Sequence, residues 1–155
     1  DCGREMVCSV TGKIALESGF HNGREWVRAE GFELPTPEVL AEAVLLVKIT
    51  FAMAGFGGCG PAKVVARKTY AAPASFPFEY SLDIPDDALA EAAQRRGSQF
   101  AVSAVLNIGW TPSGSEWIRR GDWHSNTSNS FTLPESSTTV TRDFHLVHYP
   151  LRTSD

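Results

Sequence analysis

Three side chains that could cooperate in hydrolysis lie close together in the sequence: Asp122, His124 and Ser125. A carboxylate that orients an imidazole, which in turn activates a hydroxyl, is the arrangement of a serine hydrolase. Such triads are assembled from distant segments, and the sequence has no Gly-x-Ser-x-Gly elbow to expose a nucleophile. We therefore predict that the protein is not an enzyme, and an uncharacterised hydrolase is only the third hypothesis for its function.

Two imidazoles, His145 and His148, are separated by three positions. On a helix they would share a face and could hold a metal ion, whereas on a strand they point to opposite faces. The threonines and valines around them favour a strand. The three cysteines include no Cys-x-x-Cys pair, so we predict neither a metal site nor a cofactor.

A glycine-rich segment, residues 55–60, matches the Gly-x-Gly-x-x-Gly pattern of dinucleotide-binding sites. In such a site the third glycine opens a helix whose N-terminus meets the pyrophosphate. Here Pro61 is followed by a strand pattern at residues 63–66. We therefore expect residues 55–61 to be a loop between two strands.

The thiols and one sequon give weaker signals. Cys2 and Cys8 cannot bond if the chain between them is extended, because six residues then span about 20 Å. Cys8 is predicted to be an inert core residue. Cys2 and Cys59 could meet, but we expect free thiols. Residues 126–128 (Asn-Thr-Ser) form an N-glycosylation sequon, which has meaning only in a eukaryotic secretory pathway.

The tryptophans are the strongest candidates for a binding site. Trp110 and Trp117 flank a six-residue polar segment that we expect to connect two strands of a hairpin, where they would form a cross-strand pair. Trp123 has the same parity as Trp117 and is expected on the same side. Tryptophan is costly to expose and is enriched in binding hot spots. We predict that Trp110, Trp117 and Trp123 bind a partner protein; a structural hairpin staple and sugar stacking are the alternatives.

Strict alternation of apolar and polar residues, typical of half-buried strands, dominates the sequence. Strands are predicted at residues 6–16, 45–51, 63–70, 76–84, 100–108, 117–123 and 138–148. Prolines at both margins make 76–84 an edge strand. Arg142 interrupts the apolar parity of the last strand and predicts a bulge. The Asn22-Gly23 pair predicts a tight hairpin returning through Trp26 and Val27.

Helix is scarce. Two aspartates at the start, two arginines near the end and Gly97 beyond predict a short helix near residues 86–96. Residues 36–38 (Thr-Pro-Glu) predict a single helical turn. The fold class is therefore all-β, and we predict a single antiparallel β-sandwich of about seven strands. One domain is expected over residues 1–155, with a core at about 6–148 and a long polar loop at 125–137.

Composition excludes several function classes. The 155 residues are 43% hydrophobic and 21% charged, an ordinary globular balance. Fourteen Lys and Arg against eighteen Asp and Glu give a net charge of −4, which argues against a nucleic-acid partner. No apolar run reaches the roughly 20 residues of a transmembrane helix, although peripheral membrane association is compatible with the sequence. The start at Asp1 suggests a removed or omitted presequence and favours an extracytoplasmic location, in the periplasm or an organelle lumen.

From about Val7 to Val147 the chain resembles the YbaY/YscW family of small bacterial lipoproteins, which includes the pilotins of type III secretion. The segments that carry the resemblance are 10–13 (Val-Thr-Gly-Lys), 34–35 with 43–47, 64–66, 76–80 (Phe-Pro-Phe-Glu-Tyr) and 100–106. The resemblance implies a β-sandwich without enzymatic activity. Pilotin members bind a partner protein and help it to the outer membrane. Longer segments around residues 22–23, 55–60 and 110–117 suggest a sandwich recruited for docking.

The leading hypothesis is therefore a non-catalytic protein-interaction or assembly module. It would dock on a larger membrane-associated complex, as an accessory subunit or a pilotin-like factor. The alternative is a carbohydrate or small-ligand binding module that uses exposed tryptophans.

Overall fold

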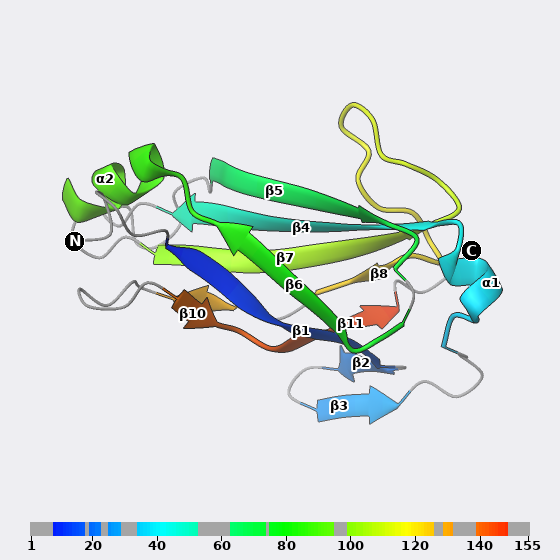
Figure 1. The fold of residues 1–155 in the computed structure, drawn as a ribbon. Coiled ribbons are helices and arrows are strands. Elements are labelled where there is room, and N and C mark those ends of the chain that lie inside the picture. Colours follow the sequence, from blue (N-terminus) through cyan, green and yellow to red (C-terminus); the bar gives the residue numbers. More distant parts are fainter. Residues whose placement is uncertain are drawn as a thin grey trace.

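The computed structural model describes residues 8–17, 19–22, 25–28, 34–52, 63–73, 75–94, 99–125, 129–131 and 139–148. Strands predominate in this part of the chain, with two short helices at the margins (Figure 1). The elements in chain order are β1 (Ser9–Glu17), β2 (Gly19–Asn22), β3 (Glu25–Arg28), α1 (Pro37–Leu40), β4 (Ala43–Ala52), β5 (Lys63–Ala71), β6 (Phe78–Asp83), α2 (Asp86–Gln94), β7 (Gln99–Ile108), β8 (Trp123–His124), β9 (Ser130–Phe131), β10 (Thr139–Thr141) and β11 (Phe144–His148).

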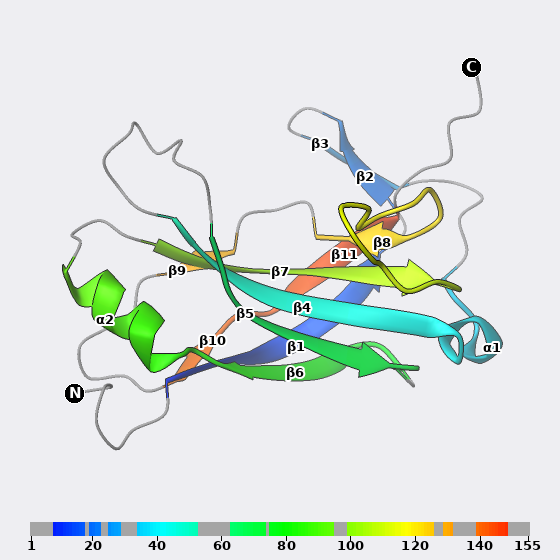
Figure 2. The same cartoon turned by 90° about the horizontal axis from the view of Figure 1, so that it is seen from above.

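One nine-stranded sheet contains all strands except the β2–β3 hairpin. Its main order is β10-β1-β11-β8-β7-β4-β5, with β6 paired to β1 and β9 paired to β7. The sheet curls strongly, so that its edge strands β5 and β6 come close to each other (Figure 2). The all-β class is confirmed. The two-sheet sandwich is not, because all described strands except β2 and β3 form one curled, open sheet.

Parallel pairing also corrects the expectation of a purely antiparallel fold. The strand β1 pairs in parallel with β10 over Ser9–Thr11 and with β11 over Ile14–Glu17. On its other side β1 pairs antiparallel with β6. The first strand of the sheet therefore lies between strands from the middle and the end of the chain.

The two helices begin where their sequences predict. Thr36 caps α1: its hydroxyl accepts a hydrogen bond from the backbone N–H of Val39, and Pro37 follows it. The first turn of α2 carries Asp86 and Asp87, whose charges suit the helix N-terminus.

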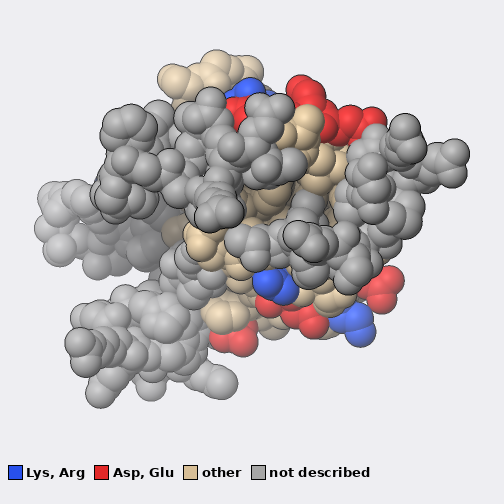
Figure 3. Space-filling view, turned by 90° about the vertical axis from the view of Figure 1, so that its left-hand side faces the viewer, with Lys and Arg blue, Asp and Glu red and all other residues tan. Residues whose placement is uncertain are grey.

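No helix among the described residues is long and apolar enough to cross a membrane. Acidic side chains stand at the margins of the molecular face drawn in Figure 3, in keeping with the net charge of −4.

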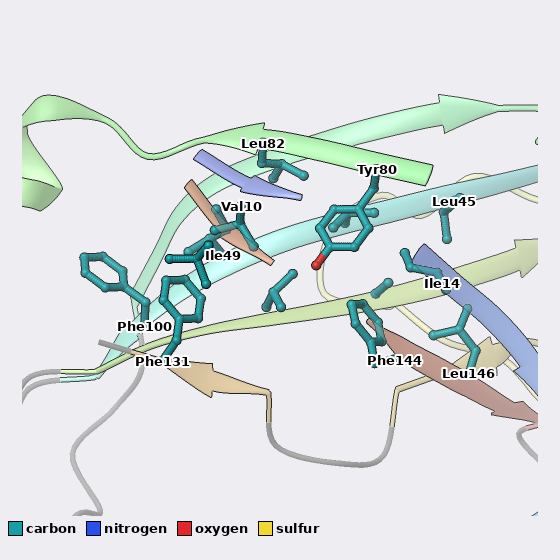
Figure 4. Packing of buried hydrophobic residues seen from close by; sticks show 14 of the residues in the cluster. Val10, Ile14, Leu45, Ile49, Tyr80, Leu82, Phe100, Phe131, Phe144 and Leu146 are labelled. Carbon is teal, nitrogen blue, oxygen red and sulfur yellow. The ribbon is translucent and has the colours of Figure 1, made fainter. Parts of the chain in front are cut away.

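The concave inner face of the sheet holds the core. Alternate residues of β1, β4, β6 and β7 point into it, together with residues of β9, β10 and β11 (Figure 4). At one end of the core the Phe100 ring lies 5.1 Å from that of Phe51 and stacks on that of Phe131 at 5.7 Å (Figure 4). The Tyr80 ring meets the Phe144 ring edge-on at 5.7 Å. Each fully buried side chain of this size contributes about 1.5–3 kcal/mol to folding.

Most of the predicted strands are confirmed within a few residues. The odd positions of β4 and the even positions of β7 from Phe100 to Leu106 are buried, as the alternation predicts. The edge position of β6 is confirmed, because β1 is its one strand partner in the described part of the chain. A hairpin is confirmed, since β2 pairs antiparallel with β3, but its register differs by one residue: Asn22 ends β2 and pairs with Glu25, so the turn falls on residues 23–24 rather than on the predicted Asn22-Gly23 pair. The residues of that turn, like the glycine-rich segment 55–60, lie outside the described residues.

The predicted last strand is two strands. The chain leaves the ladder at Arg142 and Asp143, between β10 and β11. Gly12 on β1 makes room for this crossing, because a Cβ there would lie only 1.9 Å from the Arg142 carbonyl oxygen. The Asp143 carboxylate accepts the backbone N–H of Lys13 at 2.8 Å, and the Arg142 N–H donates to the Thr11 carbonyl. The irregularity was predicted at Arg142; its form is a break rather than a bulge.

Two further expectations were wrong. Residues 117–123 are not a strand, since only Trp123 and His124 join the sheet. The predicted polar loop at 125–137 contains the short strand β9, whose Phe131 is buried against β7.

Cys8 is buried in the core, as predicted, but it is not a free thiol. Only 1% of its surface is exposed, and it is disulfide-bonded. The other two cysteines of the chain, Cys2 and Cys59, lie outside the described residues. The bond adds to the prediction for Cys8, which named only an inert core residue; the free thiols expected at Cys2 and Cys59 fall outside the described residues.

Candidate functional site

The segment between β7 and β8, residues 109–122, forms an irregular loop that we call the platform loop. Its first and penultimate residues are glycines with positive φ, Gly109 (+78°) and Gly121 (+103°), and a third, Gly114, has φ +70°. A non-glycine residue rarely adopts such angles. Gly109 also donates its N–H to the Glu42 carbonyl, which ties the start of the loop to the segment before β4.

The carboxylate of Asp122 holds the loop together. It is 2% exposed and accepts four hydrogen bonds, each 2.9 Å long. The donors are the backbone N–H groups of Ile108 and Arg119, the Asn107 amide and the Trp110 indole N–H. A buried carboxylate is costly unless it is well hydrogen-bonded, and here the donors satisfy it. Asp122 therefore fixes both ends of the loop on one anionic centre.

Asn107 links this centre to the tip of the loop. Its side-chain amide nitrogen donates to Asp122 at 2.9 Å and to the backbone carbonyl of Trp117 at 3.1 Å. The residue is fully buried on the outer side of β7. Its Oδ1 atom has no hydrogen-bond partner among the described residues. Asn107 thus fixes the backbone at Trp117 relative to the sheet.

Trp110 is half-buried, and its side chain stabilises the platform loop from within. Besides donating to Asp122, its ring lies under the guanidinium of Arg119, 3.9 Å from the ring centroid. The same guanidinium makes two hydrogen bonds of 2.9 Å to the Glu116 carboxylate. The hydrogen bond from Arg119 lowers the pKa of Glu116 below its ordinary value. These contacts order the exposed side of the platform loop.

Trp117 is the exposed member of the group. Its surface is 52% exposed, among the highest values for large apolar side chains in the described residues. The Lys48 ammonium of β4 lies 5.7 Å from the centroid of its ring, a cation–π contact. Lys48 stands opposite Arg67 of β5 in the ladder, on the outer side of the sheet. We call Trp117, Lys48 and Arg67 the docking face.

The structure separates the three predicted binding tryptophans. Trp123 is 2% exposed and packs edge-on against the His148 ring at 5.1 Å, so it cannot extend an exposed surface. Trp110 and Trp117 do not form the expected pair across a hairpin, because the loop between them is irregular and each ring contacts a different cation. Of the three, only Trp117 offers an exposed face. Sequence analysis missed Lys48, which the fold places over the Trp117 ring, and Arg67, which the strand register places opposite Lys48.

The candidate hydrolytic residues are engaged in other contacts. The Asp122 carboxylate accepts its hydrogen bonds from residues of the platform loop and of β7. The Ser125 hydroxyl accepts the backbone N–H of Ala104 and lies 3.4 Å from the Ala104 carbonyl. His124 is half-buried, and this burial lowers its pKa. His145 lies 3.9 Å from the Glu17 carboxylate, while His148 contacts Trp123.

Within the described ranges, no group of three or more His, Cys, Asp and Glu residues is placed to hold a metal ion. The sequon at 126–128 lies outside those ranges.

Comparison with known proteins gives no family for this chain. No protein-family model, no curated protein and no solved structure matches it.

Proposed function

We propose that the protein is a non-catalytic interaction module that binds a partner protein through the docking face. The observation that carries this proposal is that Trp117 is half-exposed although its backbone is held in a fixed position. A half-exposed tryptophan is costly in water, yet its backbone is fixed through Asn107 to a buried carboxylate. A side chain held in place before binding loses little entropy on association, which is the property of a binding hot spot.

The charges around Trp117 define the partner's chemistry. Lys48 and Arg67 place two cations on the outer face of a protein whose net charge is −4. No ion pair joins either residue to another residue in the described ranges. An acidic partner surface with an apolar pocket for the indole would complement both features. The partner is therefore a protein surface that presents carboxylates around an apolar recess.

The wider role that we propose is that of an accessory or pilotin-like factor in a larger membrane-associated complex. The resemblance to the YbaY/YscW family supports it. The disulfide at Cys8 supports an oxidising compartment, such as the periplasm or an organelle lumen.

Carbohydrate binding through Trp117 is the second candidate, because sugars stack on exposed indole rings. It ranks below protein binding because the face of the Trp117 ring is approached by a cation. A hydrolase ranks third, because the hydroxyl of Ser125 is engaged by the backbone of β7.

The test compares Trp117→Ser with Leu34→Ser, in full-length protein expressed in its source cells. Leu34 is a matched control, since it is 53% exposed and precedes α1, outside the docking face. The native mass of the complexes is measured by sedimentation. We expect the wild-type chain and Leu34→Ser to sediment in one large assembly, and Trp117→Ser to be released from it.

Charge reversal gives the second arm of the test. Lys48→Glu with Arg67→Glu should release the protein as Trp117→Ser does. A wild-type chain that sediments as a monomer and is retained on a glycan column would contradict protein docking and favour the carbohydrate alternative.

A further inference from the structure

The strand β6 forms the edge of the sheet at the other end of the strand order from β5, and it has the properties of a strand that can pair with a peptide. Ile84, the first residue after β6, donates its N–H to the Cys8 carbonyl. Because hydrogen-bonded positions alternate along an antiparallel pair, the even-numbered residues of β6 direct their backbone groups toward β1. The backbone N–H and C=O groups of Glu79, Ser81 and Asp83 therefore point away from β1. No strand of the described chain pairs with this edge.

Among the described residues, side chains of β5 form hydrogen bonds with the outward-facing backbone of β6 at Ser81. The Tyr70 hydroxyl lies 3.3 Å from both the N–H and the carbonyl oxygen of Ser81. The Lys68 ammonium reaches the same carbonyl at 3.4 Å. These are long contacts from exposed or half-exposed side chains, so another backbone can replace them. Next to them is a hollow of about 620 Å³, lined by residues of β1, β5, β6 and the segment 141–143.

The side chains along this edge select what can pair with it. Glu79 and Asp83 are exposed on the outer face, with Ser81 between them. Neither carboxylate forms an ion pair with another described residue. A second copy of β6 added antiparallel about Ser81 would place Glu79 opposite Asp83 twice, and like charges directly opposite are destabilising. The edge therefore disfavours a copy of itself and favours a strand with cations at those positions.

The intervening positions have the opposite character. Tyr80 and Leu82 point into the core, and the rings of Tyr70 and Phe78 meet edge-on at 4.8 Å near the open seam. Residues of an added strand that alternate with its cations would face this apolar side.

We propose that β6 binds an extended segment of a partner protein by strand addition. The segment carries basic residues four positions apart, a small hydroxyl residue midway between them and apolar residues at the two remaining positions. Backbone hydrogen bonds to Glu79, Ser81 and Asp83 supply the affinity, and the two carboxylates supply the specificity. Binding displaces the Tyr70 hydroxyl and the Lys68 ammonium from Ser81 and moves the neighbouring part of β5 away from β6, because the two strands lie too close for a strand between them. This proposal does not depend on the docking face around Trp117.

The test uses the peptide acetyl-TKVTVKT-amide and its charge-reversed form acetyl-TEVTVET-amide, titrated into the full chain by calorimetry. We expect the lysine peptide to bind about ten-fold more tightly or better, since two cross-strand pairs change sign. In the variant Glu79→Lys with Asp83→Lys the preference should reverse. The control Glu38→Lys with Glu42→Lys, which changes the net charge equally at exposed positions around α1, should keep the wild-type preference.

Amide hydrogen exchange locates the bound peptide. We expect the lysine peptide to slow exchange at Glu79, Ser81 and Asp83, and Tyr70→Phe to strengthen binding a few-fold because a competing hydroxyl is removed. Strand addition is overturned if neither peptide binds at millimolar concentration. It is also overturned if the peptide preference is the same in the β6 variant as in the wild type, or if exchange at these three amides is unchanged.

Discussion

Replacing Asp122 by asparagine tests whether one buried carboxylate holds the platform loop. The change preserves shape but leaves only one carbonyl oxygen for four donors. The least costly orientation keeps that oxygen toward Asn107, Trp110 and the Arg119 N–H, and turns the new amide group toward the N–H of Ile108. Three charge-assisted hydrogen bonds then become neutral, and one buried donor loses its acceptor.

The magnitude follows from these four contacts. Each retained bond weakens by about 0.5–1 kcal/mol, and an unsatisfied buried N–H costs about 1–3 kcal/mol. Relief from burying a charge offsets part of this sum, so we expect a loss of about 2–4 kcal/mol in the free energy of unfolding. Urea unfolding followed by tryptophan fluorescence measures it as a lower midpoint with an unchanged slope.

Asp83→Asn is the matched control, because that carboxylate is exposed and forms no ion pair with another described residue. It should change the free energy of unfolding by less than about 0.5 kcal/mol. Acrylamide quenching of the tryptophans should also increase in Asp122→Asn at native conditions, since the hydrogen bond that holds the Trp110 indole N–H becomes a weaker, neutral one. A stability loss equal to that of the control would refute the role assigned to Asp122.

Three further predictions concern the core and the thiols. Gly12→Ala should lower the free energy of unfolding by several kcal/mol, or prevent folding, because its Cβ would overlap the Arg142 carbonyl; circular dichroism melting checks this. Burial lowers the pKa of His124 and of His148, so the unfolded chain binds protons first as the pH falls. Stability should be constant above about pH 6.5 and decline below it, and this decline should shrink in a variant with Gln at both positions. Because Cys8 is disulfide-bonded, alkylation of the unreduced, denatured protein should modify one of the three cysteines, and mass spectrometry that finds three modified would contradict the bond.

Local patterns predicted the regular strands because burial in this fold follows the two-residue period. Leu45, Val47 and Ile49 are all fully buried, and Lys48 between them is not, as the alternation of β4 requires. The single turn at Thr36 was predictable for the same reason: a cap is decided by residues within one turn.

Long-range contacts decided the remaining features. The parallel pairing of β1 with β10 and β11 joins residues about 130 positions apart, and no local pattern encodes such a pairing. The segment from Trp117 to Trp123 was predicted as a strand, yet the four donors that converge on Asp122 hold it as a loop. Asp122 was considered only as an acid for His124, because a buried structural carboxylate has no sequence signature of its own. The role of Gly12 depends likewise on where Arg142 crosses.

The position of β1 determines when this chain can fold. One side of β1 pairs with β6, from the middle of the chain, but among the described residues its other side pairs only with β10 and β11, so that side stays unpaired until those two strands have been synthesised. Contacts of such sequence separation close slowly. During synthesis the protein therefore passes through a state in which one side of β1 is unpaired. A chaperone or a translocation channel can hold this state, and the sheet is complete only after β10 and β11 are released.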